Sequence, residues 1–154
     1  MNHDDWMREA LNEAYGALAA GEIPVGAIVV WQDQIIGRGR NRREEMHDPT
    51  AHAEILALRE AGQSRGRWRL SDTLLYCTLE PCSMCAGALV NARVETLVYG
   101  LPDPKAGGAG SVYDLVRSPW LNHRLKVIGG ILSEEIQQVM QQFFANLRQD
   151  KSGL

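Results

Sequence analysis

Hydrophobic residues recur along this chain with two different periods. Near both ends, apolar positions follow helical spacing, and short β-branched apolar runs lie between them. The pattern predicts helices over residues 5–20, 49–61, 81–91 and 133–148, and strands over 23–31, 35–40, 73–79, 94–99 and 125–128. Strands alternate with helices after an initial hairpin. We therefore expect an α/β fold, a three-layer α/β/α sandwich around a five-stranded mixed sheet.

Local signals place the starts of two of these helices. Asp48 is expected to cap the second helix and Pro49 to occupy its first position, while Pro81 suits the start of the third. The second helix is expected to be buried through three aliphatic side chains. They are Ile55, Leu56 and Leu58. The segments 41–48 and 100–111 lack periodicity and are predicted to be loops, and long loops in compact domains tend to be functional.

Length and composition limit the class of protein. A chain of 154 residues suits one domain, 1–154, with a real core. The net charge of −3 argues against indiscriminate nucleic-acid binding, so a nucleic-acid partner would need a local basic surface. No apolar run is long enough for a membrane span, and the acidic N-terminal stretch is no secretory signal. The three cysteines do not suggest disulfides, and we expect a cytoplasmic protein with no membrane contact.

The main chemical signal is a pair of cysteines. Cys82 and Cys85 are separated by two residues, the spacing of a metal-binding pair, and the N-terminus of a helix favours their thiolate form. His52 offers a third ligand. Three nitrogen and sulfur ligands leave one position of a tetrahedral zinc site for water, which is typical of a catalytic zinc.

Glu54 follows His52 by two residues and is the natural base for that water. In the middle of a helix, two such side chains would point about 200° apart, so both can serve one metal only at a helix end. The alternative is a structural zinc with a fourth ligand, and that arrangement would leave Glu54 without a purpose. Candidates for that ligand are Cys77, His47 and His123.

The combination of His-x-Glu with Pro-Cys-x-x-Cys is the signature of zinc-dependent nucleobase deaminases. Beyond the signature, the chain resembles the bacterial tRNA-specific adenosine deaminases of the cytidine and deoxycytidylate deaminase superfamily. The resemblance runs from Trp6 to Phe144. It is carried by residues 23–27, 41–42, 47–55, 79–88, 103–111 and 122–124.

This resemblance implies a cytidine-deaminase-like fold, a homodimer and one zinc ion per subunit, held by His52, Cys82 and Cys85. It implies that Glu54 transfers protons while the wobble adenosine of an arginine tRNA becomes inosine in the anticodon stem-loop. It also implies a set of substrate-binding residues. They are Val25, Asn41, Ala53, Asp103, Lys105, His123, Phe143 and Phe144.

Several of these residues have a simpler interpretation. Asn41 and Asp103 can equally be turn residues, and His123 can be a surface histidine. Phe143 and Phe144 are adjacent on a helix, so we expect one in the core and the other free for substrate or partner. Two other functions share part of the signature: a deaminase of a free base or nucleoside such as guanine or cytosine, and a non-catalytic zinc-bearing RNA-binding module.

Overall fold

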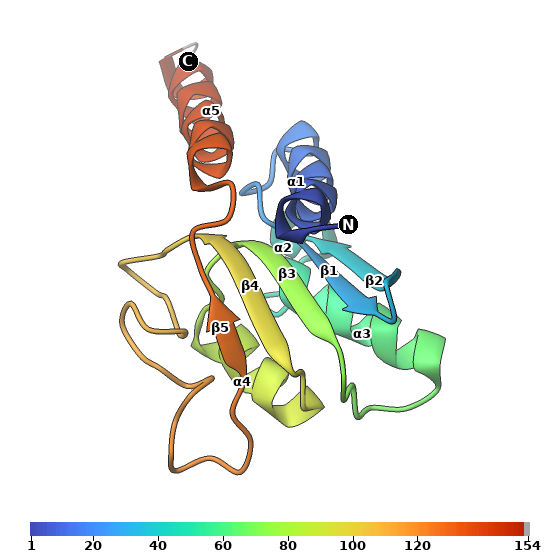
Figure 1. The fold of residues 1–154 in the computed structure, drawn as a ribbon. Coiled ribbons are helices and arrows are strands. Elements are labelled where there is room, and N and C mark those ends of the chain that lie inside the picture. Colours follow the sequence, from blue (N-terminus) through green and yellow to red (C-terminus); the bar gives the residue numbers. More distant parts are fainter. Residues whose placement is uncertain (153–154) are drawn as a thin grey trace.

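A five-stranded mixed sheet forms the centre of the molecule, with the strand order β2-β1-β3-β4-β5 (Figure 1). The computed structural model describes the backbone of residues 1–152 and the side chains of residues 1–150. The strands are β1 (Gly26–Trp31), β2 (Gln34–Arg40), β3 (Leu74–Leu79), β4 (Thr96–Leu101) and β5 (Lys126–Ile128). Strand β1 pairs antiparallel with β2 and β3, whereas β3–β4 and β4–β5 are parallel pairs.

Helices cover both faces of the sheet (Figure 1). On one face lie α1 (His3–Ala19) and α5 (Ser133–Ser152), and on the other α3 (Ala53–Arg65) and α4 (Ser83–Ala92). Each face buries its own hydrophobic cluster against the sheet. The three-layer α/β/α sandwich with a five-stranded mixed sheet is confirmed. Within the described residues, no helix combines the length and apolar character that a membrane span needs.

The first hairpin differs from the prediction at its start. Strand β1 begins at Gly26, three residues later than predicted, because Ile23 to Val25 form a tight turn closed by the Val25 N–H on the Ile23 carbonyl (2.9 Å). Gln32 and Asp33 connect β1 to β2 with φ values of 50° and 58°. Two consecutive residues with positive φ match the two-residue turn that suits the twist of a hairpin.

Both predicted helix starts around the candidate ligands are wrong. Helix α3 begins at Ala53 instead of Pro49, and α4 begins at Ser83 instead of Pro81. Asp48 does not cap α3, because its Oδ1 accepts hydrogen bonds from the N–H and hydroxyl of Thr50 (2.8 and 2.7 Å) in a local turn. The predicted loop before it contains a short helix, α2 (Arg43–Met46).

Helix α3 is buried through small residues, not through the aliphatic ones that we expected. Ala53, Ala57 and Ala61 are fully buried, while Ile55, Leu56 and Leu58 are half-buried. The reason lies on β2, where the helix backbone approaches two glycines. A Cβ on Gly39 would lie 2.1 Å from the Ala53 carbonyl oxygen, and one on Gly37 would lie 2.2 Å from that of Ala57.

Toward the C-terminus the elements are found where predicted, with shifted ends. Strand β4 runs from Thr96 to Leu101 and includes the two residues that we assigned to the following loop. That loop connects β4 to the short β5, and α5 extends beyond the predicted residue 148 to Ser152. Because β3 and β4 are parallel, their carboxyl ends meet at one edge of the sheet, and α4 and the loop both leave from that edge.

Candidate active site

Three candidate ligand atoms converge at one point. His52 Nδ1 lies 3.6 Å from Cys82 Sγ and 3.5 Å from Cys85 Sγ, and all three atoms lie within 4.8 Å of one another. Zinc bonds of about 2.3 Å to sulfur and about 2.0 Å to nitrogen, at a tetrahedral angle, place the two donors about 3.5 Å apart. The donor set therefore fits a zinc ion with one coordination position left over.

No fourth protein ligand joins this group within the side chains that the structure describes. Cys77 is fully buried in β3 and lies outside it, as do His47 and His123. The structure therefore gives no support to a closed, four-ligand structural site. A three-ligand site is the open kind, in which a water or substrate atom takes the remaining position.

Helix ends position the ligands. His52 and Cys82 are the N-cap residues of α3 and α4, both with extended backbone, and Cys85 lies in the first turn of α4. The carbonyls of His52 and Cys82 accept the first hydrogen bonds of their helices, from Leu56 and Ala86 (3.1 and 2.8 Å). Two helix N-termini thus face one point, and Glu54, in the first turn of α3, lies beside it.

The electrostatics of the group suit a cation. The hydrogen bond from Cys85 is the main cause that lowers the pKa of Cys82, to about 3, and the same contact raises the pKa of Cys85. The contact with Cys82 raises the pKa of His52. Burial raises the pKa of the Glu54 carboxyl, which moves it toward the range of a general base at neutral pH. The lowered pKa of Cys82 favours its thiolate form, which is the form that binds metal.

A pocket of about 200 Å³ opens beside the ligands. This volume is smaller than the roughly 300–1,000 Å³ of pockets for drug-sized ligands, and it suits one small ring system. The pocket brings together residues from five separate segments of the chain. Its lining is Ile23, Val25, Asn41, Arg43, His52, Ala53, Glu54, Leu79, Glu80, Cys82, Asp103 and Ala106. Of the predicted substrate-binding residues, Val25, Asn41, Ala53 and Asp103 lie here.

Asn41 and Asp103 also make the turn contacts of their simpler interpretation. The Asn41 side chain donates to the Ile23 carbonyl (3.2 Å) and accepts from the Arg43 N–H (3.2 Å). Asp103 Oδ1 accepts from the N–H groups of Lys105 and Ala106 (3.0 and 3.2 Å). Both side chains therefore shape the rim of the pocket while they line it.

Comparisons with known proteins agree with this geometry. The family model of MafB19-like deaminases matches residues 1–148. The tRNA-specific adenosine deaminase of Bacillus subtilis (strain 168) is 44% identical over 154 residues, covering 99% of this chain and 96% of that protein. A solved structure from work on A-to-I editing by tRNA deaminases at the wobble position superposes with a TM-score of 0.85 and 40% identity, covering 88% of this chain and 98% of the other.

This chain belongs to the tRNA-specific adenosine deaminase family. The guanine deaminase of Nitrosomonas europaea also superposes, with a TM-score of 0.78 at 24% identity, covering 94% of this chain and 85% of that one. At that identity the likeness shows the shared fold alone. It indicates that the same sandwich serves other deaminases, and that the pocket walls must separate their substrates.

Four of the residues implied by the likeness to this deaminase family do not line the pocket. Lys105 is exposed next to Ala106 at the rim. His123 lies near the opposite end of the sheet, where its Nε2 is 2.7 Å from the carbonyl oxygen of Val94, just before β4. Phe143 and Phe144 lie on α5, with their ring centres 5.3 Å apart in an edge-to-face arrangement.

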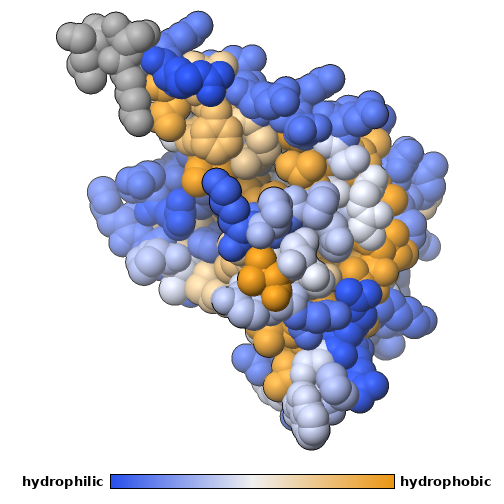
Figure 2. Space-filling model, turned by 90° about the vertical axis from the view of Figure 1, so that its left-hand side faces the viewer, coloured by the Kyte–Doolittle hydropathy of each residue, from blue (hydrophilic) through white to orange (hydrophobic). Residues whose placement is uncertain are grey.

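Our expectation that one of the two phenylalanines belongs to the core is wrong. Phe143 is half-buried and Phe144 is 45% exposed, whereas Ile136 and Val139 form the core side of α5. Figure 2 shows apolar side chains gathered over this helix, next to the C-terminal end of the chain. Helix α5 projects beyond the sheet (Figure 1), so its second half has little of the molecule to pack against.

Some pocket residues of this deaminase were not singled out from the sequence. Ile23 falls within the predicted strand 23–31, and Glu80 falls within the segment 79–88 that carries the resemblance. Arg43 was one of four arginines between residues 38 and 43. The other three form ion pairs with Glu9, Glu13 or Glu45, and Arg43 alone of the four lines the pocket. The sequence signal for Arg43 was its place directly after the Asn41-Arg42 pair.

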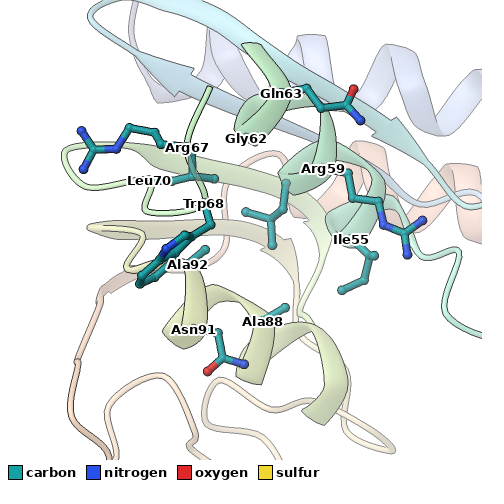
Figure 3. A pocket seen from close by; sticks show the side chains of 11 residues that line it. Ile55, Arg59, Gly62, Gln63, Arg67, Trp68, Leu70, Ala88, Asn91 and Ala92 are labelled. Atoms are coloured by element: carbon teal, nitrogen blue, oxygen red, sulfur yellow. The ribbon is translucent and has the colours of Figure 1, made fainter. Parts of the chain in front are cut away.

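A larger groove of about 610 Å³ lies elsewhere, between α3 and α4 (Figure 3). Its apolar floor includes Ile55, Leu58, Leu70 and Ala88, and Trp68 lies along one side near Ala92. None of the three candidate ligands lines it, and neither does Glu54. The smaller pocket, where ligands and a buried carboxylate converge, is therefore the candidate active site.

Proposed function

We propose that this chain, as one deaminase domain over residues 1–154, hydrolyses the wobble adenosine of a tRNA anticodon loop to inosine, with an arginine tRNA as substrate. The observation that carries this is the meeting of His52, Cys82 and Cys85 with Glu54 at a pocket sized for one base. Membership in the adenosine deaminase family selects adenosine from among the possible bases.

The chemistry follows from the residues around the pocket. His52, Cys82 and Cys85 would hold one zinc ion per subunit, which when bound supplies a Lewis acid that lowers the pKa of water toward neutrality. Glu54 would take the two protons of the attacking water in turn, passing the first to N1 and the second to the leaving amine. A C6–O bond forms, the C6–N bond breaks, and the products are inosine and ammonia. The buried, pKa-raised carboxyl of Glu54 suits a group that both takes and gives protons.

The pocket walls would recognise a single extruded base. The base must leave its stack to reach the site, and an anticodon loop offers unpaired bases at low cost. Val25, with Ile23 and Leu79, supplies an apolar surface for the base. Asn41 keeps one N–H and one lone pair free of its backbone contacts, and these would bond the nucleotide.

Residues around the opening would bind the flanking nucleotides. Arg43 and Lys105 bring positive charge to the rim, where Asp103 would contact the RNA backbone beside the target. The exposed Phe143 and Phe144 would border the anticodon-loop cleft. His123 lies near the opposite end of the sheet and does not line the pocket, so it would contact RNA only outside the target base. A tRNA substrate is in keeping with a cytoplasmic enzyme.

An ammonia-release assay separates this function from its rivals. The zinc-loaded protein is incubated with transcribed arginine tRNA, with adenosine, and with free guanine and cytosine. We expect ammonia from the tRNA, with inosine at the wobble position. Ammonia mainly from a free base or nucleoside would favour the small-molecule deaminase, and tRNA binding without ammonia would favour the non-catalytic RNA-binding module.

We further propose that two copies of the chain form a homodimer through the groove between α3 and α4. Gly87 and Ala88 are partly exposed on α4, and a Cβ on Gly87 would meet no atom within 4 Å. Small residues let a partner helix approach closely, and Ala88 itself lines the apolar groove (Figure 3). Ala86 is buried in the core of its own chain and takes no part.

A further inference from the structure

Glu80 is a buried carboxylate in the pocket wall to which the proposed chemistry gives no task. It is 2% exposed and lies two residues before Cys82. Four donors of a single loop converge on it. Oε1 accepts from the Asp103 N–H (3.0 Å) and from the Ser111 hydroxyl, and Oε2 accepts from the N–H groups of Ala109 (3.0 Å) and Ser111 (3.1 Å).

The four contacts use both oxygens of the Glu80 carboxyl group as acceptors. Every partner is a donor, and only a carboxylate offers two oxygens that accept without donating. Because both oxygens are engaged, Glu80 is not available as a second base, and proton transfer is left to Glu54.

The same loop is also fastened to the turn that carries Cys82. The Gly108 N–H donates to the Pro81 carbonyl (2.7 Å), and Gly107 forms an isolated antiparallel bridge with Cys82. The approach is so close that a Cβ on Gly107 would lie 2.3 Å from Glu80 Oε2. The segment 103–111 therefore touches both the carboxylate and the ligand-bearing turn.

We infer that Glu80 is a positioning residue, which holds the segment 103–111 against the ligand-bearing turn so that Asp103 and Ala106 form one wall of the base pocket. Asp103 and Ala106 line that pocket, and among the described side chains the Asp103 N–H donates to Glu80 alone. The consequence for substrate binding rests on the proposed function, whereas the anchoring of the loop does not.

The opposite rim supplies a matched control. Glu22 is also 2% exposed, and its two oxygens accept the N–H groups of Glu44 and Glu45 in α2 (3.1 and 2.8 Å). It therefore anchors the segment that carries Arg43. Substitution of either glutamate by glutamine keeps the shape of the side chain but turns an N–H₂ group toward backbone donors.

Hydrogen exchange tests the anchoring directly, in the zinc-loaded full chain. In Glu80→Gln we expect amide exchange in segment 103–111 to rise about tenfold or more, since a broken contact of about 1.4 kcal/mol changes an opening equilibrium tenfold. Segment 43–46 should be unchanged. Glu22→Gln should give the reverse pattern. Unaltered exchange over 103–111 in Glu80→Gln would overturn the inference, whatever the enzyme acts on.

Kinetics test the positioning role. For the anticodon stem-loop we expect Glu80→Gln to raise KM about tenfold while kcat changes less than about threefold and zinc stays bound, since loss of a pocket wall weakens binding. Ser111→Ala removes one of the four contacts, so it should raise both the amide exchange of segment 103–111 and KM, each by less than Glu80→Gln does. This milder variant keeps the role testable if Glu80→Gln folds poorly. A fall in kcat with an unchanged KM would contradict the role. If the unmodified protein does not deaminate the stem-loop, the proposed function is wrong. The anchoring of segment 103–111 is then tested by hydrogen exchange alone.

Discussion

Two buried carboxylates in one pocket have opposite environments, and this difference supports the separate roles that we propose for them. Glu80 is surrounded by four donors, and its pKa is lowered. Glu54 is buried beside the ligand group, and burial raises its pKa. Pairs of acids whose surroundings push their pKa values apart commonly divide the work of a site. This contrast is in keeping with our proposal that Glu80 acts as an anchor and Glu54 transfers protons.

The role of Glu54 predicts a clear phenotype. Glu54→Gln keeps the shape of the side chain and removes a buried acid, so the fold and the metal should persist. Deamination should fall by about 10²-fold or more, because proton transfer by a positioned side chain is worth that much. Inosine formation and zinc content are measured on the same sample. A zinc-loaded variant with near-normal turnover would remove Glu54 from the mechanism.

The proposed metal ligands can be tested by comparing Cys85, which belongs to the ligand group, with Cys77, which is buried outside it. Cys85→Ala should strip the metal and lower thermal stability, since ligation of a metal is also folding energy. Cys77→Ala deletes a thiol that is equally buried but lies outside the group, so zinc should stay at one per chain. Elemental analysis decides the matter, and full zinc occupancy in Cys85→Ala would show the ligand assignment to be wrong.

At the scale of elements, the site depends on how closely α3 lies on β2. The helix rests on Gly37 and Gly39 through its alanines, and Ala53 directly follows the ligand His52. The glycine–alanine contact therefore fixes the position of the helix end that carries both His52 and Glu54. A displacement there would move a ligand and a base together.

This packing leads to a graded prediction. Gly39→Ala and Gly37→Ala should each lower the free energy of unfolding by about 1–3 kcal/mol, because an added methyl group overpacks the contact. Only Gly39→Ala acts next to His52, so it should also weaken zinc retention against a chelator, while Gly37→Ala should retain zinc better. Denaturant unfolding and chelator competition measure the two effects. Equal zinc loss in both variants would contradict the local explanation.

Most elements could be predicted from the sequence, but the starts of the two ligand-bearing helices could not. Asp48 and Pro49 are good helix-start signals, yet Asp48 bonds Thr50 in a turn and the helix begins at Ala53. Likewise, Ile23 and Val25 do not extend β1, but line the pocket and pack on the hydrophobic core. Local propensity gave way to tertiary contacts at both places, as is expected near a functional site.

The sequence predicted those site residues that belong to the His-x-Glu and Pro-Cys-x-x-Cys motifs. The spacing of the cysteines and of His52 and Glu54 indicated one metal group, and the structure brings the three ligands together. Glu80 could not be assigned from the sequence, since its partners come from residues 23 to 31 positions later. Such contacts depend on how the loop folds back onto Glu80, and the hydrophobic periodicity of the sequence does not predict this.

At the scale of the whole molecule, the pocket and the apolar groove are lined by different sets of residues, and the net charge is −3. Arg38, Arg40 and Arg42 are occupied by ion pairs with glutamates. A local basic rim around Arg43 and Lys105 is therefore a better description than a general polyanion surface. This arrangement suits the binding of one short RNA loop.

The proposed dimer can be tested on the groove itself. Ala88→Arg places a long cation beside Arg59 and Arg67 and should convert the dimer to monomers at micromolar concentration, through bulk and like-charge repulsion. Gln141→Arg adds the same charge at an exposed position of α5 and should leave the dimer intact. Light scattering measures both. A monomeric, fully active parent protein would rule out this interface.

The most direct test of the central claim compares two substrates in the zinc-loaded protein. The kcat/KM for inosine formation is measured for an anticodon stem-loop with adenosine at the wobble position and for free adenosine under the same conditions. We predict a value about 10²-fold or more higher for the stem-loop, because the flanking nucleotides supply the binding energy that holds the base in place. Equal values for the two substrates would contradict a tRNA-specific enzyme and favour a deaminase of free nucleosides.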